Sequence, residues 1–301
     1  MVGESVTIDG QELAFEMENL RSILGAVYAH PESVWLPGVE LAGRSWPLHG
    51  DLGGDHLIVV DFARRYDLDR RIGEARARGQ DDVAGHLETM RDRIGVLVAD
   101  VSGHSVTDAL LAAMLHQSFL VGVAYELACH GEVTVELFDI LNTRFYHSSS
   151  VTKFVTMIYG EIAGDGTFRF ISAGHPAPLV YSAQQQRFVD LDRSRLVSVP
   201  PIGIFPTEND IDQAREERLP LGVAPRPAVN EVRLLGSGDV LLLTTDGAAD
   251  QARGDLAAAL EPTMRAVASL PAASIVDCLH AELRHCGPPV DDVTLVAIKK
   301  H

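Results

Sequence analysis

Apolar residues at helical spacing mark the first element that the chain predicts. Between residues 11 and 30 an apolar side chain recurs every three or four positions, at Leu13, Met17, Leu20, Leu24 and Val27. This period is typical of an amphipathic helix, and Pro31 ends it. The stripe has two interpretations: it packs on the body of the protein, or it pairs with a second copy in a homodimer through residues 11–30.

Shorter apolar runs predict β-strands between further helices. The segment before residue 63 reads as two strands joined by a loop, and the second, His56 to Phe62, is apolar enough to be buried. Two hairpins are expected after Lys153, with turns at "GDG" and "SAQQQ", and two later strands lie in "GDVLLLTTDGAAD" and "PPVDDVTLVAIKK". Further helices are expected over 107–127, 134–146 and 272–285. No repeat or clean linker is visible, so we expect an N-terminal helical segment, 1–35, and one domain, 36–301.

A charged stretch at 64–93 differs from its surroundings. It holds eight arginines and seven acidic residues, while Val83, Leu87, Met90 and Ile94 keep helical spacing. This pattern predicts a charged helical insertion. It is either a solvated helix face crossed by salt bridges or a docking and regulatory element.

The composition narrows the classes of function. The chain has 301 residues, of which 46% are hydrophobic, and a net charge of −17. An acidic surface argues against non-specific binding to nucleic acid and against docking on anionic membranes. We expect neither a transmembrane span nor a signal peptide. Three scattered cysteines, Cys129, Cys278 and Cys286, predict reduced thiols in a cytoplasmic protein.

Acidic residues recur at the ends of apolar strands. They are Asp55 in "GGDHLIVV", Asp100 in "VLVADVSG", Asp246 in "VLLLTTDGA", and Asp291 and Asp292 in "VDDVTLVAI". One such aspartate is usually a turn residue or a helix cap. If the strands lie side by side, however, their tips form a negative cluster that needs protons or a cation. Oxygen ligands alone favour Mg²⁺, Mn²⁺ or Ca²⁺, and a pair of such ions can activate a water for attack on phosphorus.

Seven motifs in a fixed order give the chain a family resemblance. They are "GGD" (53–55), "ADVSGHS" (99–105), "FVTMIYGEI" (154–162), "SAGHPAPLV" (172–180), "PPIGI" (200–204), "GDVLLLTTDGAAD" (238–250) and "DDVTLVAI" (291–298). Over residues 36–300 the chain resembles the SpoIIE-type, RsbU-like branch of the protein phosphatase 2C (PPM) serine/threonine phosphatases. The resemblance implies an α+β fold: a four-layer α-β-β-α sandwich of two mainly antiparallel sheets flanked by helices.

The same resemblance implies a site with two Mn²⁺ or Mg²⁺ ions. The implied metal ligands are Asp55, Asp100, the Val101 carbonyl, Asp246 and Asp291, with Asp292 as the alternative to Asp291. Asp100 would bridge the ions, and Asp100 and Asp246 would be the catalytic residues. A metal-bridging hydroxide would then attack phosphoserine or phosphothreonine, so no side chain is needed as the nucleophile.

The resemblance also implies partners. The expected substrate is a phosphorylated bacterial signalling protein, such as an anti-sigma-factor antagonist, and Gly174 and His175 of "SAGHP" are candidate substrate-binding residues. For His175 a structural role stays open beside this one. An activator protein would act through the 11–30 helix or the 64–93 insertion, the segments that a catalytic core does not require.

Two departures from the family pattern leave alternatives open. Ser105 stands where the family usually has glycine, and Ile58 stands where an acid is common. These changes are compatible with a pseudophosphatase that binds a partner without turnover. A metal-dependent hydrolase of small phosphate esters is a third interpretation.

Overall fold

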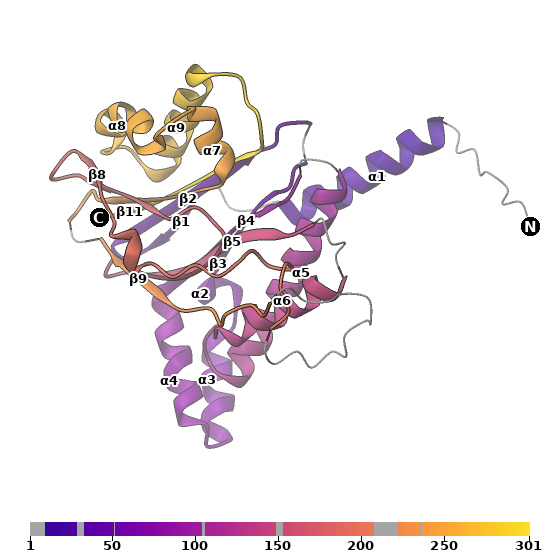
Figure 1. The fold of residues 1–301 in the computed structure, drawn as a ribbon. Coiled ribbons are helices and arrows are strands. Elements are labelled where there is room, and N and C mark those ends of the chain that lie inside the picture. Colours follow the sequence, from indigo (N-terminus) through magenta and orange to yellow (C-terminus); the bar gives the residue numbers. More distant parts are fainter. Residues whose placement is uncertain are drawn as a thin grey trace, which may run out of the picture.

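The computed structural model describes residues 10–28, 33–50, 52–103, 106–148, 153–207, 222–234 and 236–301. Two β-sheets lie face to face at its centre, and helices cover their outer faces (Figure 1). Every pairing between neighbouring strands in these sheets is antiparallel. The α+β sandwich expected from the sequence is therefore observed.

Each sheet is built from strands that are distant in the chain. The five-stranded sheet has the order β3 (Asp55–Asp61), β4 (Arg93–Val101), β5 (Val155–Ala163), β6 (Thr167–Ala173), β9 (Asn230–Arg233). The six-stranded sheet has the order β1 (Ser33–Leu36), β2 (Val39–Trp46), β11 (Val293–Lys300), β10 (Val240–Thr244), β7 (Leu179–Ser182), β8 (Arg187–Val189). Both predicted hairpins are present, as β5–β6 and β7–β8.

Strand alternation produces the apolar layer between the sheets. Side chains one residue apart on a strand point to opposite faces, so every second residue faces the partner sheet. The inward row includes Leu57, Val96, Val98, Ile158, Leu241, Leu243, Val296 and Ile298, all buried in one cluster. The intervening residues are buried against helices, which explains why these strands read as continuous apolar runs.

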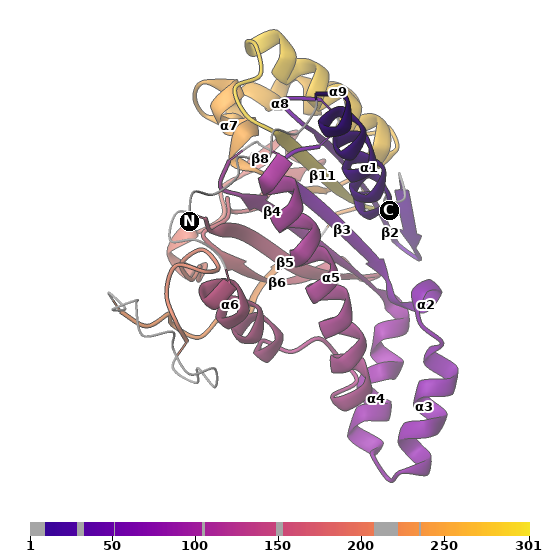
Figure 2. The same ribbon diagram turned by 90° about the vertical axis from the view of Figure 1, so that its right-hand side faces the viewer.

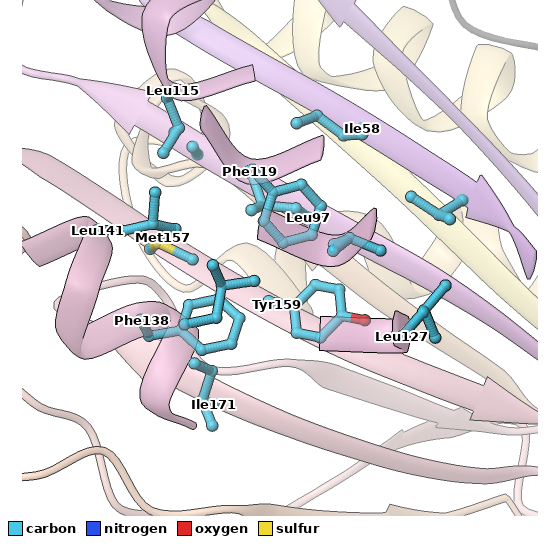
Figure 3. Close-up of a cluster of buried hydrophobic side chains, with 14 of the residues drawn as sticks. Ile58, Leu97, Leu115, Phe119, Leu127, Phe138, Leu141, Met157, Tyr159 and Ile171 are labelled. Atoms are coloured by element: carbon cyan, nitrogen blue, oxygen red, sulfur yellow. The ribbon is translucent and has the colours of Figure 1, made fainter. Parts of the chain in front are cut away.

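Helices complete the outer layers. On the six-stranded sheet lie α7 (Asp246–Ala252), α8 (Leu256–Val267) and α9 (Ala272–Cys286). On the five-stranded sheet lie α5 (Val106–Cys129) and α6 (Glu136–Ser148). Figure 3 shows Leu115 and Phe119 of α5 over Leu97 and Tyr159 of the sheet. The sequence predicted α5, α6 and α9 but missed α7 and α8, as it missed strand β1.

The charged stretch forms the expected helical pair. It contains α2 (Phe62–Arg65), α3 (Leu68–Ala77), α4 (Asp81–Thr89) and a 3₁₀ turn (Met90–Asp92). Elsewhere in the chain, a second 3₁₀ turn lies at Arg193–Arg195. Helices α3 and α4 extend away from the sandwich as a hairpin (Figure 2). Its charges form surface ion pairs, among them Arg70–Glu74 and Arg91–Asp69, while apolar residues such as Leu87 are buried.

The N-terminal helix, α1 (Gly10–Tyr28), packs on α5 with the end of its apolar stripe. Leu24 is buried, and Leu20 and Val27 contact the same small cluster with Ala109 and Ala113. Packing on the body of the protein is therefore observed for this part. The side chains of Leu13 and Met17 and residues 29–30 lie outside the described part of the chain.

Helix α5 bears on the expectation that the chain has no transmembrane span. Over Thr107–Cys129 it is long and apolar enough to cross a membrane, judged by length and composition alone. The core helix of a globular protein passes the same test, and α5 buries Leu115, Phe119 and Leu127 in the core. Cys129, Cys278 and Cys286 are free thiols, as predicted.

Candidate active site

The predicted aspartates lie at strand ends in both sheets. Asp55 opens β3 and stands directly opposite Asp100, near the end of the neighbouring strand β4. Asp246 begins α7 just after β10, and Asp291 comes shortly before β11, which pairs with β10. A cluster of these acids requires that their strands be adjacent. Strands β3 and β4 are neighbours in one sheet, and β10 and β11 are neighbours in the other.

The apolar layer between the sheets ends in polar residues at this point. Five of them continue the inward rows of their strands: Asp55, Asp100, Thr156, Thr245 and Thr294. Apolar packing cannot satisfy carboxylates and hydroxyls, so these groups must bond to one another or to a ligand. The polar layer is therefore where chemistry is expected.

Two threonines hold Asp55 in place. The hydroxyls of Thr245 and Thr294 both donate to its Oδ2, at 2.7 and 2.8 Å, and Thr294 N donates to Thr245 Oγ1 at 2.9 Å. Burial and the facing Asp100 raise the pKa of Asp55 well above its usual range, while the two threonine bonds oppose this. Because both threonines come from the other sheet, this network joins the two sheets.

Asp100 has the most repulsive surroundings of the group. Its pKa is raised to about 7 by burial and by the charges of Asp246, Asp291, Asp292 and Asp108. Near neutral pH, therefore, only about half of the Asp100 side chains are ionised when no cation is bound. Asp246 shows the same effect more weakly, because burial and Asp291 raise its pKa.

Asp291 and Asp292 differ in what their side chains do. Asp292 is buried and accepts backbone N–H bonds from Leu48 and Gly54, both at 2.6 Å, so its two oxygens already hold the chain. Gly53 must be glycine here, since a Cβ would lie 2.2 Å from the Asp292 carboxylate. Asp291 is more exposed and acts electrostatically on Asp100 and Asp246. The geometry favours Asp291 over Asp292 as a metal ligand.

The turn after Asp100 is fixed from two sides. A Cβ on Gly54 would lie 2.6 Å from the Val101 carbonyl oxygen, so only glycine permits this approach. On the other side Lys153 Nζ donates to the Ser102 carbonyl at 2.8 Å and to Asp108 Oδ1 at 2.5 Å. Neither Lys153 nor the two threonines, Thr245 and Thr294, were predicted from the sequence. The only sequence signal for the threonines is their position beside the acids at the ends of two apolar strands.

His175 lies inside the molecule. It is buried, its Nδ1 is 3.1 Å from Thr156 Oγ1, and burial lowers its pKa to about 3. Its side chain is thus a neutral part of the polar layer and does not reach solvent, which argues against the predicted direct contact with substrate. Gly174 has φ = +64°, and its N–H is already used within the protein, since it donates to the Val199 carbonyl at 2.8 Å.

The departures from the family pattern have different positions. Ile58 is buried among residues that face the helices, on the opposite side of β3 from Asp55. The missing acid therefore leaves the inward-facing carboxylates unchanged. Ser105, like His104, lies outside the described residues.

The oxygen-rich cluster has the donor chemistry that divalent cations prefer. In the described ranges, no group of three or more His, Cys, Asp or Glu side chains stands as a metal cage. The donor chemistry fits nevertheless: Asp100, Asp246 and Asp291 offer only oxygen, and they repel one another unless positive charge is supplied. Hard cations such as Mn²⁺ or Mg²⁺ would relieve this repulsion.

Comparison with known proteins identifies the family. The family model for stage II sporulation protein E (SpoIIE) matches residues 90–301. The chain belongs to the SpoIIE family. Phosphoserine phosphatase RsbP from Bacillus subtilis (strain 168) is 28% identical over 127 residues, which are 41% of this chain and 30% of RsbP. The resemblance seen in the sequence motifs is thereby confirmed.

Solved structures of SpoIIE-family and other PP2C-type proteins share the fold. The RsbU and RsbW domains of Rv1364c from Mycobacterium tuberculosis match with a TM-score of 0.60 and 23% identity, over 90% of this chain and 62% of that one. The PP2C domain and regulatory fragment of Bacillus subtilis SpoIIE give 0.59 and 14%, over 90% and 65%. The SiaA-PP2C domain of Pseudomonas aeruginosa gives 0.57 and 15%, over 95% and 90%. The chain thus spans less than a third of RsbP and under two thirds of the first two structures.

Proposed function

We propose that this SpoIIE-family protein is a metal-dependent protein serine/threonine phosphatase. One observation carries the proposal: carboxylates from both sheets meet at one end of the sandwich, where Asp100 has a pKa raised to about 7. Such a cluster stores electrostatic repulsion that binding of divalent cations releases. Metal ligation is proposed for Asp100, the Val101 carbonyl, Asp246 and Asp291, with Asp55 behind them.

The residues of this chain would divide the work. Bound Mn²⁺ or Mg²⁺ would supply positive charge for the phosphoryl group and activate a water. Asp100 and Asp246 would hold the ions from opposite sheets. Asp55, fixed by Thr245 and Thr294, keeps the β3–β4 edge in register with the β10–β11 edge.

No side chain is assigned as nucleophile or as histidine acid. The Ser102 hydroxyl accepts the Phe154 amide hydrogen at 3.2 Å and sits in the turn. His175, with its pKa lowered to about 3, carries no proton to give at neutral pH. Protonation of the leaving alkoxide is left to solvent.

The names of the relatives support a substrate class. RsbP is named a phosphoserine phosphatase, and Rv1364c joins an RsbU domain to an RsbW domain. We infer a phosphorylated signalling protein, such as an anti-sigma-factor antagonist, as the substrate. A cytoplasmic location, an activator protein and the division at residue 35 stay predictions. So does a homodimer through residues 11–30, for which α1 has exposed Phe15 and Ile23 available.

The test compares variants with two substrates. Hydrolysis of a phosphoserine protein and of an aryl phosphate is measured with Mn²⁺ and with EDTA, for wild type, Asp100→Asn, Asp246→Asn and the exposed control Asp190→Asn. We expect Mn²⁺-dependent hydrolysis of the phosphoprotein, retained in the control and lost by roughly 10²-fold or more in the two site variants.

Other outcomes select the other interpretations. Binding of the phosphoprotein without turnover under every condition indicates a pseudophosphatase. Efficient hydrolysis of the aryl ester alone indicates a small-molecule hydrolase. Full activity of Asp100→Asn in EDTA contradicts the proposed site.

A further inference from the structure

A cavity of about 320 Å³ lies at the far end of the five-stranded sheet. Its lining includes Arg93, the first residue of β4, whereas Asp100 is seven residues further along the same strand. At about 3.3 Å per residue, Arg93 lies roughly 23 Å from Asp100 along the strand, whereas Tyr159 and Ile171 in the lining lie level with Leu97, roughly 10 Å from Asp100 and on the helix-facing side of the sheet. A ligand bound there would not compete with a substrate at the proposed active site.

The floor of the cavity is apolar and aromatic. Phe138 of α6, Tyr159 of β5 and Ile171 of β6 lie side by side there (Figure 3), and the Phe138 and Tyr159 ring centroids are 5.3 Å apart. The wall opposite the sheet is the connection from α5 to α6, residues 130–135. Apolar floors of this size with a few polar groups at the edge are typical of small-molecule sites.

Two of the glutamates in the lining, Glu161 and Glu136, already form ion pairs with arginines. Arg93 Nη1 donates to Glu161 Oε2 at 2.8 Å, and the Tyr159 hydroxyl donates to Glu161 Oε1 at 2.9 Å. Glu136 at the rim forms an ion pair with Arg226. The charges of these residues are compensated within the protein, so they are not the groups that select a ligand.

One charge of each sign remains. Arg169 of β6 is exposed and has no ion pair within 4.0 Å in the portion of the chain that the structure describes, although Glu161 and Glu231 stand opposite it on the two neighbouring strands. In the described part of the chain Glu132 has one possible ion-pair partner within 4.0 Å, His86, whose Nδ1 is 3.7 Å away and also lies 2.9 Å from the His130 carbonyl. The Nδ1 hydrogen is therefore used by a neutral acceptor, and Glu132 keeps its charge available.

We propose that this cavity binds a small zwitterion, namely a free amino acid with a bulky apolar side chain. Its carboxylate bonds to Arg169, its ammonium group bonds to Glu132, and its side chain covers Phe138 and Ile171. A plain carboxylate would use Arg169 but leave Glu132 without a cationic partner from the ligand. A plain amine would leave Arg169 without a partner.

The binding experiment uses the whole chain and four probes. Isothermal titration with phenylalanine and with leucine is compared with 3-phenylpropanoate, which lacks the ammonium group, and 2-phenylethylamine, which lacks the carboxylate. We expect saturable 1:1 binding of at least one amino acid and at least tenfold weaker binding of both analogues. Absence of saturable amino-acid binding up to about 10 mM overturns the proposal, as does equal binding of either analogue.

Variants then place the ligand in this cavity. Arg169→Gln and Glu132→Gln are each expected to weaken amino-acid binding about tenfold. The matched control is Arg233→Gln, an exposed arginine of the neighbouring strand β9 that pairs with Asp165 outside the lining. Unchanged binding in both cavity variants, or an equal loss in the control, overturns the assignment. Binding is measured without any phosphatase assay, so this test and that of the proposed function fail independently.

Discussion

Replacing Asp100 with asparagine should make the metal-free protein more stable. The substitution keeps the shape of the side chain and removes its charge from a site where burial and four acids raise the pKa to about 7. In the unfolded chain an aspartate titrates near 3.9. The ionised folded state therefore carries about 3 pKa units of unfavourable interaction, or about 4 kcal/mol.

The sign of the pH dependence follows from proton uptake. Between the unfolded and folded pKa values the native protein holds a proton that the unfolded chain has lost, so stability falls as pH rises from about 4 to about 7. Asparagine does not titrate and escapes this loss. The free energy of unfolding of Asp100→Asn should exceed that of wild type by about 4 kcal/mol near pH 8 and by about 2 kcal/mol near pH 5.

Thermal unfolding in EDTA measures the effect. With an unfolding entropy of about 2.1 cal/mol/K per residue, the gains correspond to roughly 6 °C near pH 8 and 3 °C near pH 5. Asp190→Asn, at an exposed position, serves as the control and should shift the midpoint by less than about 1 °C. A loss of stability in Asp100→Asn near pH 8, or an equal gain at both pH values, would refute the repulsion on which the metal proposal depends.

Three further substitutions test the supports of the site. Thr294→Val removes a hydrogen bond to buried Asp55 and should lower the free energy of unfolding in urea by about 1–3 kcal/mol, whereas Thr294→Ser should keep most of it. Gly54→Ala places a Cβ 2.4 and 2.6 Å from carbonyl oxygens of the turn after β4 and should reduce Mn²⁺-dependent hydrolysis at least about tenfold. Gly85→Ala, in an open helical position, is its control and should retain full activity. Asp292→Asn turns one acceptor of a backbone N–H bond into a donor, so calorimetry should show a loss of about 2–3 kcal/mol.

Periodicity predicted most elements because burial imposes it. The helical stripe of α1 and the continuous runs of β3 and β4 read directly from the chain, since each follows from which faces meet apolar neighbours. The misses have physical reasons too. Helix α7 has seven residues, fewer than the window of about 11 in which helical periodicity is recognised, and strand β1, with four, is at the lower limit for recognising alternation.

The sequence indicated which aspartates belong to the candidate site, but it did not indicate which residues hydrogen-bond to them. Strand-end position drew attention to Asp100 and Asp246 without any knowledge of strand order. It could not separate Asp291 from Asp292, because only the fold shows that Asp292 is used by backbone amides. The burial of His175 and the Thr294–Asp55 bond depend on how one sheet packs on the other, which no local pattern encodes.

The way the strands interleave also controls when the protein can begin to work. Strand β11 is synthesised after the other strands of its sheet, yet it is inserted between β2 and β10 in the middle of that sheet and brings Thr294 to Asp55. A nascent or prematurely terminated chain that ends before residue 291 would have Asp55 and Asp100 but neither the second half of the ligand set nor a closed sheet to carry it. Incomplete copies would therefore lack the site on which the proposed activity depends.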